Sequence, residues 1–207
     1  MSASNDLWTH PSPLLLASGS RTRRDLLATA GILAETLSPE IDERGLERAM
    51  ADANGEGVAS ALASAKAVEV SRRRPGRLVL GADQTLTLGS ERFHKPANLD
   101  VACAQLAQLA GRTHTLHAAA ALAKDGAVIV SFCDAARLTV RSLDEAVIRA
   151  YAEIVGTERL TSSVGGYQFE GLGIHLFERI EGAHSTILGL PLLPLLAHLR
   201  ELGLLAI

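Results

Sequence analysis

A short apolar run leads directly into a basic helix near the start of the chain, and this junction limits the fold more than any other feature. Leu14–Ala17 predicts a buried strand, Ser18–Ser20 predicts a turn, and a helix over about 21–30 is expected to follow. A strand that ends in small residues and opens a helix leaves free backbone N–H groups at one point. Three arginines begin this helix within four positions, so the junction suits a polyanion such as the phosphate chain of a nucleotide. A helix start with solvated arginines explains this segment alone equally well.

Length and composition fit one domain with a sizeable core. The chain has 207 residues, of which 47% are hydrophobic, and its formal net charge of −3 argues against a general nucleic-acid-binding surface. Cys103 and Cys133 lack the spacing of a metal or redox pair, which favours a reducing compartment. No apolar run reaches the roughly 18 residues that a membrane span needs. We therefore expect a mobile tail over 1–13, a single domain over 14–207, a cytoplasmic location, and no membrane or stable nucleic-acid partner.

Strand-like and helix-like segments alternate along the chain, which indicates an α/β fold with a mixed sheet. An apolar stripe from Val58 to Val68 predicts a helix over 56–73, and residues 45–55 before it predict a loop or a weak helix. Ser142 and Glu145 form a capping box for a helix that runs to about 155. The remaining expected elements are strands over 34–37, 78–80, 113–123, 127–140 and 174–180, a hairpin over 85–94, helices over 100–109 and from Pro191 onward, and a loop over 162–173.

Carboxylates follow two of the expected strands, at the sheet edge where ligands of open α/β folds collect. Asp83 comes at the end of the strand over 78–80, and the acidic residues Glu40, Asp42 and Glu43 come after the strand over 34–37. Two carboxylates brought together there could hold Mg²⁺ or Mn²⁺, or one of them could take a proton from water. The alternative for the acidic run is a solvated loop, whereas a carboxylate directly after apolar strand residues needs a partner.

Two lysines, Lys66 and Lys95, could act as compact point charges beside phosphates. The ordinary alternative for Lys66 is a stem that lies along the apolar stripe of its helix, and the alternative for Lys95 is a surface lysine at the hairpin exit. His114 and His117 are three positions apart on an expected strand and so lie on opposite faces, which disfavours a shared metal. The chain lacks the P-loop, dinucleotide-binding, zinc-protease and hydrolase-elbow motifs, which excludes those common classes.

Eight short motifs follow one another over about 14–203. They are Leu16–Arg23 with Leu26 and Leu27, Pro39–Glu43, Lys66 within Ala65–Ala67, Gly81–Asp83, Lys95 with Pro96, Leu109–His114, Gly165–Gly171 and Gly189–Leu192. In this order they resemble the Maf (septum formation inhibitor) family of nucleoside triphosphate pyrophosphatases. The resemblance implies a Maf/ITPase-like α/β fold, in which helices flank an elongated mixed β-sheet and a cleft separates two lobes. It also implies hydrolysis of a nucleoside triphosphate to the monophosphate and pyrophosphate with a divalent metal cation, Mg²⁺ or Mn²⁺, in a protein that forms a homodimer.

The resemblance assigns roles to individual residues. Asp83 would be the proton acceptor that activates water, and Glu40 together with Asp83 would hold the metal. Attack at the α-phosphorus develops charge on oxygen atoms, which a metal and fixed cations stabilise. The catalytic set would be Asp83, Glu40, Lys66 and Lys95, with Ser18, Ser20 and Arg23 in the turn that binds the phosphates.

Three positions that look like specificity positions depart from the family's pyrimidine-preferring pattern of Arg, Thr and Gln. Here they are Thr22, Gln84 and Glu170, which are all expected to contact the substrate. Gln84 and Glu170 resemble the 7-methyl-GTP pyrophosphatase-like branch, although Thr22 replaces the bulky aromatic residue of that branch. A carboxylate at Glu170 can accept hydrogen bonds from guanine N1–H and N2–H₂. The resemblance therefore implies a guanine-type or modified purine substrate.

The leading interpretation is a housecleaning enzyme that removes non-standard nucleoside triphosphates before polymerases use them, with a link to cell-division arrest. The first alternative is a non-catalytic nucleotide-binding regulator of septum formation, against which the full acidic and lysine set argues. The second is an RNA-binding module that uses Arg21–Arg24 and Arg72–Arg74. The acidic net charge and the aromatic content of 3% disfavour this second alternative.

Overall fold

The computed structural model describes residues 7–207, and the chain divides into two compact units. Unit 1 comprises the described part of Met1–Gln84 together with Ala118–Asp134 and Leu188–Ile207. Unit 2 comprises Thr85–His117 and Ala135–Ile187. Each unit has its own core, and each is described below by itself.

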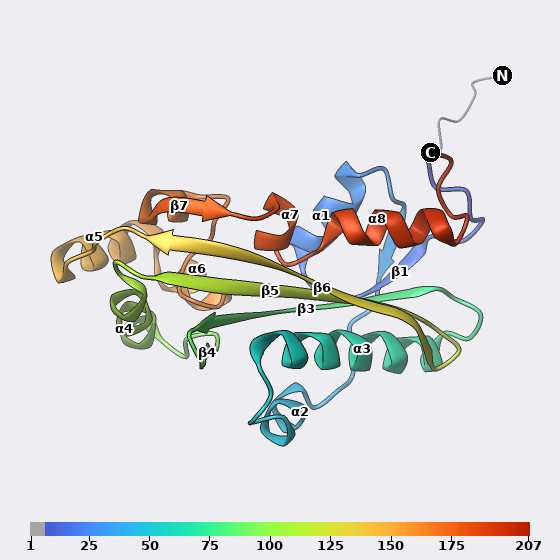
Figure 1. Ribbon diagram of the computed structural model, residues 1–207, viewed down its shortest axis with the longest axis horizontal. Helices are drawn as coiled ribbons and strands as arrows, with labels where there is room; N and C mark the ends of the chain where they lie inside the picture. Colours follow the sequence, from blue (N-terminus) through green and yellow to red (C-terminus); the bar gives the residue numbers. More distant parts are fainter. Residues whose placement is uncertain (1–6) are drawn as a thin grey trace. The chain divides into compact units, whose positions relative to one another are not determined.

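The elements alternate along the chain as an α/β protein requires (Figure 1). The strands are β1 (Leu14–Ala17), β2 (Ala34–Thr36), β3 (Val79–Leu88), β4 (Glu91–Phe93), β5 (Thr113–Lys124), β6 (Ala127–Val140) and β7 (Phe177–Glu181). The helices are α1 (Arg21–Thr29), α2 (Glu43–Ala49), α3 (Gly55–Arg73), α4 (Leu99–Leu109), α5 (Glu145–Val155), α6 (Thr157–Ser162), α7 (His184–Ile187) and α8 (Leu192–Glu201), and η1 (Leu172–Leu176) is a 3₁₀ helix. None of the helices within residues 7–207 has the length and apolar character needed to cross a membrane.

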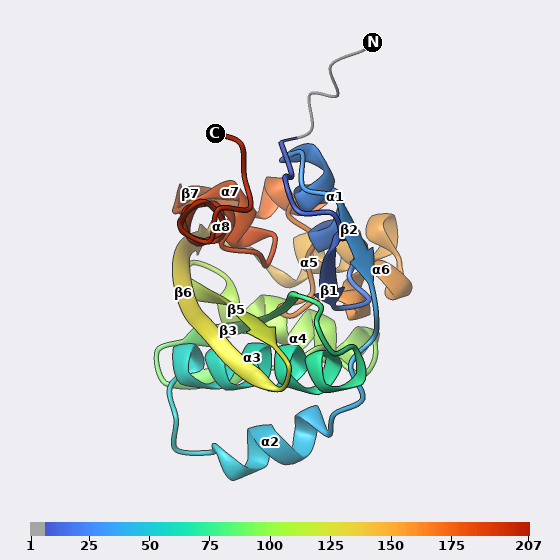
Figure 2. The same ribbon diagram turned by 90° about the vertical axis from the view of Figure 1, so that its right-hand side faces the viewer.

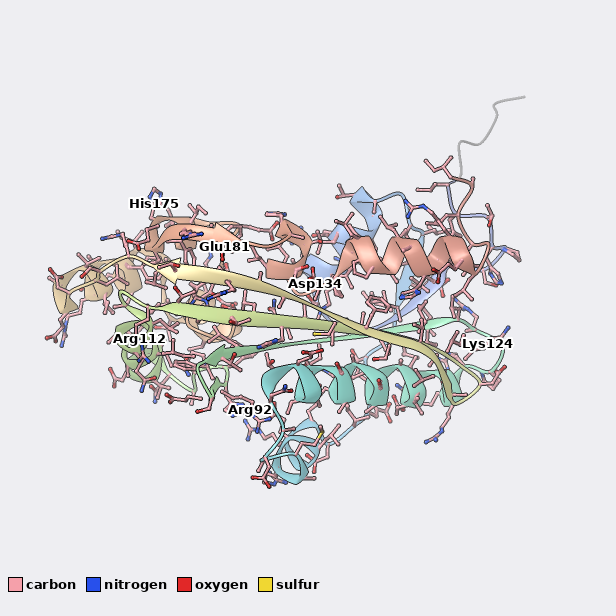
Figure 3. The ribbon with its side chains drawn as sticks, viewed as in Figure 1. Arg92, Arg112, Lys124, Asp134, His175 and Glu181 are labelled. Atoms are coloured by element: carbon pink, nitrogen blue, oxygen red, sulfur yellow. The ribbon has the colours of Figure 1, made fainter. Side chains whose placement is uncertain are left out.

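Seven strands form one mixed sheet in the order β2-β1-β3-β5-β6-β7, with β4 paired to β3. β1 is parallel to both β2 and β3, whereas β4 and β7 pair antiparallel with β3 and β6. Lys124, labelled in Figure 3, ends β5, and Asp125 and Gly126 form the turn between the two strands expected over 113–123 and 127–140. The mixed sheet with its flanking helices confirms the expected fold class.

Strand β1 of unit 1 is buried on both faces because its side chains alternate between two layers of helices. Leu14 and Leu16 of β1 belong to a core with residues of α1 and α8, whereas Leu15 and Ala17 pack with the alanine-rich face of α3. Figures 1 and 2 show α3 on one side of this strand and α8 on the other. Burial on both faces explains why the run that predicts β1 is uniformly apolar.

The helix α3 approaches β3 closely at Gly81. A Cβ atom added at Gly81 would lie 2.1 Å from the carbonyl oxygen of Ala63 and 2.6 Å from the backbone nitrogen of Ala67. Any other residue would therefore push the backbone of α3 away from the strand. This close approach fixes the distance between β3 and Lys66, the residue before Ala67 in α3.

Unit 2 is built around a larger aliphatic and aromatic core. Leu86 of β3 and Leu138 of β6 pack there with Leu106 of α4, and α5 and α6 add Ile148 and Leu160. Tyr167 is buried in the same core, although it belongs to the loop between α6 and η1. The glycine-rich loop that the sequence predicts over 162–173 is thus tied to the core of its unit.

The described part of the N-terminal segment contacts the end of the chain. Trp8 forms an isolated β-bridge with Leu205, and its indole N–H donates to the carbonyl oxygen of Ser12 at 2.9 Å. Its side chain lies in the core that contains α8. Residues 1–6 of the tail expected over 1–13 lie outside the described residues.

Three local predictions were wrong, each for a physical reason. β3 continues to Leu88, because it pairs with β4 and β5, so Asp83 lies within a strand rather than at its end. The N-cap of α5 is Asp144, whose side chain accepts from Val147 N at 2.8 Å, so Ser142 and Glu145 form no capping box. The last strand begins at Phe177 rather than at 174, because residues 172–176 form η1, and α6 takes up the start of the expected loop over 162–173.

Candidate active site

Arg23 of α1 is fixed by three oxygen atoms from separate parts of unit 1. Its Nη1 donates to the carbonyl oxygen of Ala82 at 2.9 Å and to Ser18 Oγ at 3.2 Å, and its Nε donates to the carbonyl oxygen of Gly189 at 2.8 Å. The pairing of β1 with β3 ends one residue before Ala82, so this carbonyl lies beyond the end of β1. Within residues 7–207, Arg23 Nη2 makes no hydrogen bond, and the guanidinium therefore keeps a donor for an anion.

The turn before α1 has the hydrogen bonds of a helix cap. Ser20 is the N-cap, and its Oγ accepts from Arg23 N at 3.4 Å. Ser18 Oγ accepts from Ser20 N at 3.2 Å and is buried. Thr22 lies in the first turn of the helix and is half-buried. The helix N-terminus and the Arg23 guanidinium both favour negative charge at this end of β1.

Asp83 of β3 and Lys66 of α3 form a buried ion pair. Lys66 Nζ donates to Asp83 Oδ1 at 2.7 Å, and the two residues are 7% and 8% exposed. Burial raises the pKa of the Asp83 carboxyl above its ordinary value, and the neighbouring Lys66 ammonium and Arg23 guanidinium oppose this rise. Burial lowers the pKa of the Arg23 guanidinium, against the opposing effect of Asp83 and Glu43, but an arginine stays charged. Lys66 is thus the partner that a carboxylate after apolar strand residues needs.

Glu43, rather than Glu40, is the second carboxylate beside Lys66. Glu43 Oε2 lies 3.0 Å from Lys66 Nζ, and Glu43 is the first residue of α2. Glu40 Oε1 instead accepts from Arg73 Nη1 at 2.7 Å, and the Glu40 side chain is 75% exposed. The sequence feature that could have distinguished Glu43 from Glu40 is Asp42, the N-cap of α2. A cap residue fixes where a helix begins and so makes Glu43 the first helical residue.

Gln84 lies on the other face of β3 from Asp83, as neighbouring residues of a strand do. A Cβ atom at Gly189 would lie 3.4 Å from both Gln84 Oε1 and Arg23 Nη2. The Gln84 amide and the Arg23 guanidinium thus border the same stretch of backbone. Gln84 is half-buried.

The predicted site residues divide between the two units. Ser18, Ser20, Thr22, Arg23, Lys66, Asp83 and Gln84 all belong to unit 1, whereas Lys95 and Glu170 are exposed residues of unit 2. His114 and His117 have different partners, because His114 Nε2 lies 2.6 Å from Tyr167 Oη and His117 Nε2 lies 3.1 Å from Thr87 Oγ1. This agrees with their expected places on opposite faces of a strand.

The carboxylates of unit 1 fit a divalent cation that arrives with phosphate. Within residues 7–207, no group of three or more His, Cys, Asp or Glu side chains is placed to hold a metal ion. Glu43 and Asp83, however, both contact the ammonium group of Lys66. Lys66 Nζ lies 3.0 Å from the Glu43 carboxylate and 2.7 Å from the Asp83 carboxylate. Mg²⁺ is usually held by one or two carboxylates and by oxygen atoms of the substrate's phosphates. The donor set therefore suits such a shared site rather than a site made by the protein alone.

Comparisons with known proteins identify the family of this chain. The family model described as "Maf-like protein" matches residues 13–202. A Rhodopseudomonas palustris (strain HaA2) protein named nucleoside triphosphate pyrophosphatase is 54% identical over 201 residues, or 97% of this chain and 98% of the relative. A Mesorhizobium japonicum protein named 7-methyl-GTP pyrophosphatase is 52% identical over 192 residues, or 92% of this chain and 96% of the relative. A solved HAM1 protein from Coxiella burnetii is similar over 62% of this chain and 72% of that chain, with 16% identity and a TM-score of 0.44. The family model over residues 13–202 and the two relatives above 50% identity show that the chain belongs to the Maf-like family.

Proposed function

We propose that this protein hydrolyses nucleoside triphosphates to nucleoside monophosphates and pyrophosphate. The observation that carries the proposal is the buried Asp83 carboxylate, which contacts Lys66 and lies close enough to Arg23 for the charges to interact. A proton acceptor and two fixed cations thus occupy one place in unit 1. The names of the two relatives, a nucleoside triphosphate pyrophosphatase and a 7-methyl-GTP pyrophosphatase, support the same reaction.

In the proposed mechanism, Asp83 takes a proton from the water that attacks the α-phosphorus. The Lys66 ammonium holds Oδ1 of Asp83 in place, and burial makes this carboxylate a stronger base than an exposed one. Arg23 binds the phosphate chain through Nη2, since its other donors are used by the protein. Lys66 and Lys95 neutralise charge on the phosphates, and the N-terminus of α1 with Ser18 and Ser20 orients them.

A divalent cation, Mg²⁺ or Mn²⁺, would neutralise the charge that develops on phosphate oxygens. Asp83 would hold it, together with a second carboxylate. The family resemblance gives this second place to Glu40, but Glu43 is the carboxylate that shares Lys66 with Asp83. We propose Glu43 for this role, with Glu40 as the alternative that the variants below separate.

The choice of Glu43 predicts a contrast between two glutamates of one short segment. We expect Glu43→Gln to lower turnover about 100-fold, because it removes one of the two carboxylates proposed to hold the cation that neutralises phosphate charge. Glu40→Gln should change turnover less than about threefold, because it removes an exposed ion pair with Arg73. Steady-state rates of pyrophosphate release at several Mg²⁺ concentrations provide the measurement. A larger loss in Glu40→Gln than in Glu43→Gln would return the role to Glu40.

Three side chains are proposed to contact the base: Thr22, Gln84 and Glu170. Glu170 is central, because a carboxylate can accept from N1–H and N2–H₂ of guanine and favours a cationic, methylated ring. The proposed substrate is therefore a guanine-type or modified purine nucleoside triphosphate. A relative named 7-methyl-GTP pyrophosphatase, at 52% identity, supports this choice.

The test is a substrate panel with the purified full-length protein and either Mg²⁺ or Mn²⁺. We expect equal amounts of monophosphate and pyrophosphate, with 7-methyl-GTP cleaved faster than dTTP or UTP. Faster cleavage of dTTP and UTP would contradict the base assignment but not the reaction. Nucleotide binding without hydrolysis of any member of the panel would contradict the reaction and favour a non-catalytic regulator.

The remaining expectations rest on the family resemblance alone. We propose that the protein works in the cytoplasm as a homodimer and removes non-standard nucleotides, with an effect on cell division. Sedimentation measures the dimer, and overexpression followed by microscopy of the dividing cells measures the effect on division.

A further inference from the structure

Glu170 lies in a tight turn of unit 2. The backbone nitrogen of Gly171 donates to the carbonyl oxygen of Gln168 at 3.2 Å, so Phe169 and Glu170 are the two central residues of this turn. The Glu170 side chain is exposed and makes no hydrogen bond or ion pair with any other residue in 7–207. The turn therefore presents a carboxylate that is available to a ligand.

The residue before this turn is anchored by a buried hydrogen bond to β5. Tyr167 Oη lies 2.6 Å from Nε2 of His114, and the two residues are 5% and 0% exposed. Burial lowers the pKa of His114 to about 4 and raises the pKa of Tyr167, so both side chains are neutral at neutral pH. The hydrogen bond within this neutral pair, whose direction follows the His114 tautomer, fixes the end of the Tyr167 side chain.

Packing holds the Tyr167 ring and backbone as well. The ring stands edge-on to Phe177 of β7, with a centroid distance of 4.9 Å. A Cβ atom at Gly165 would lie 2.9 Å from Cε1 of this ring, so only glycine allows the chain to pass beneath it. Ser163 Oγ donates to the Tyr167 carbonyl oxygen. Both the side chain and the main chain of Tyr167 are thus fixed directly before the turn.

The other side of the turn is fixed by η1. A Cβ atom at Gly173 would lie 2.4 Å from the carbonyl oxygen of Gln168, which shows how closely η1 packs on the turn. Arg141 Nε donates to the carbonyl oxygen of His175, the η1 residue labelled in Figure 3, at 2.9 Å. With anchors before and after it, the turn has little freedom to change the position of Glu170.

We propose that Tyr167 and His114 are positioning residues for base selection, which fix the turn that carries Glu170. The inference rests on the proposed function, because it takes Glu170 as the residue that reads a guanine-type base. Neither residue touches the reacting atoms in this account. Their loss should therefore change which base is preferred, through KM, while kcat for a given substrate stays nearly the same.

The experiment measures kcat and KM for 7-methyl-GTP and UTP in four proteins: the wild type, Tyr167→Phe, Glu170→Gln and the double variant. We expect Tyr167→Phe to lower the ratio of the two kcat/KM values about tenfold, the size of one charged hydrogen bond. In the Glu170→Gln background, the same change should alter the ratio less than twofold, because the side chain that it positions has lost its charge. The thermal midpoint should fall by the same amount in both backgrounds.

Two further variants separate positioning from general stability. His114→Gln keeps a hydrogen-bonding group for the Tyr167 hydroxyl and should keep the ratio within about threefold of the wild type, whereas His114→Leu should match Tyr167→Phe. Thr113→Val removes the Thr113–Thr139 hydroxyl contact, on the face of β5 opposite to His114, and should leave the ratio unchanged.

An equal fall of the ratio in both backgrounds would overturn the proposal, as would an unchanged ratio in both Tyr167→Phe and His114→Leu. If Glu170→Gln still hydrolyses both nucleotides and keeps the wild-type ratio of the two kcat/KM values, the proposal would also be overturned. The proposed pyrophosphatase function would not be affected by that result. Absence of hydrolysis in the wild type would instead contradict the proposed function itself.

Discussion

Asp83→Asn should lower nucleoside triphosphate hydrolysis about 100-fold to 10,000-fold while the protein stays folded. The loss is the contribution of a general base, which the amide cannot replace. The fold should survive because an asparagine side chain has nearly the same size and its oxygen can still accept from Lys66 Nζ. Glu43 Oε2, 3.0 Å from that nitrogen, continues to compensate the buried ammonium. Single-turnover rates of pyrophosphate release measure the loss, and far-UV circular dichroism with a thermal melt checks the fold.

Asp25→Asn is the matched control for this variant. Asp25 is an exposed carboxylate of α1, in unit 1, whose ion pairs with Arg21 and Arg24 are also exposed. Because exposed pairs contribute little, the rate should stay within about twofold of the wild type. Near-normal hydrolysis by Asp83→Asn would remove Asp83 from the proposed mechanism.

Gly81→Ala should destabilise the protein by about 3 kcal/mol or more, at the upper end of what overpacking costs. The added Cβ would lie 2.1 Å from a backbone oxygen of α3, and a helix backbone cannot move aside as a flexible side chain can. Where the protein still folds, α3 must retreat from β3 and take Lys66 away from Asp83. Turnover should therefore fall together with the free energy of unfolding, which urea denaturation measures.

Gly171→Ala is the control for the stability measurement. The nearest atom to its added Cβ would be 3.8 Å away, and its φ of −127° suits any residue, so the change should stay below about 0.5 kcal/mol. Combining Gly81→Ala with Ala67→Gly should give no rescue, because the closest contacts are with the backbone of α3. Recovery of stability in that double variant would show that the Ala67 methyl group, rather than the backbone, limits the approach.

The sequence predicts the parts of the site that depend on local pattern. The apolar run of β1, the small residues after it and the basic helix lead to α1 and Arg23, and the stripe of α3 places Lys66 beside a buried face. Asp83 stands out because a charge among apolar strand residues needs a partner. In each case the signal is contained in a few neighbouring residues.

The parts that the sequence leaves open depend on contacts between distant residues. The hairpin predicted over 85–94 is present as the pairing of β3 with β4, but the sequence does not show that β3 runs without a break from 79 through Asp83 to 88. Glu40 and Glu43 are three positions apart and chemically alike, and their difference depends on Arg73 and Lys66 of α3. The predicted cap of α5 was wrong for a local reason. Ser142 and Asp144 are both good N-cap residues, but the helix begins after only one of them, Asp144.

Arg23 has a consequence for how the protein is made. Its oxygen partners come from positions 18, 82 and 189, which a ribosome synthesises at very different times. Asp83, Lys66 and Arg23 itself emerge from the ribosome well before Gly189 does. The arginine proposed to bind phosphate is therefore fully oriented only after residue 189 has emerged. A growing chain that stops short of residue 189 lacks this support, so the capacity to cleave nucleotides should arise only once Gly189 is in place.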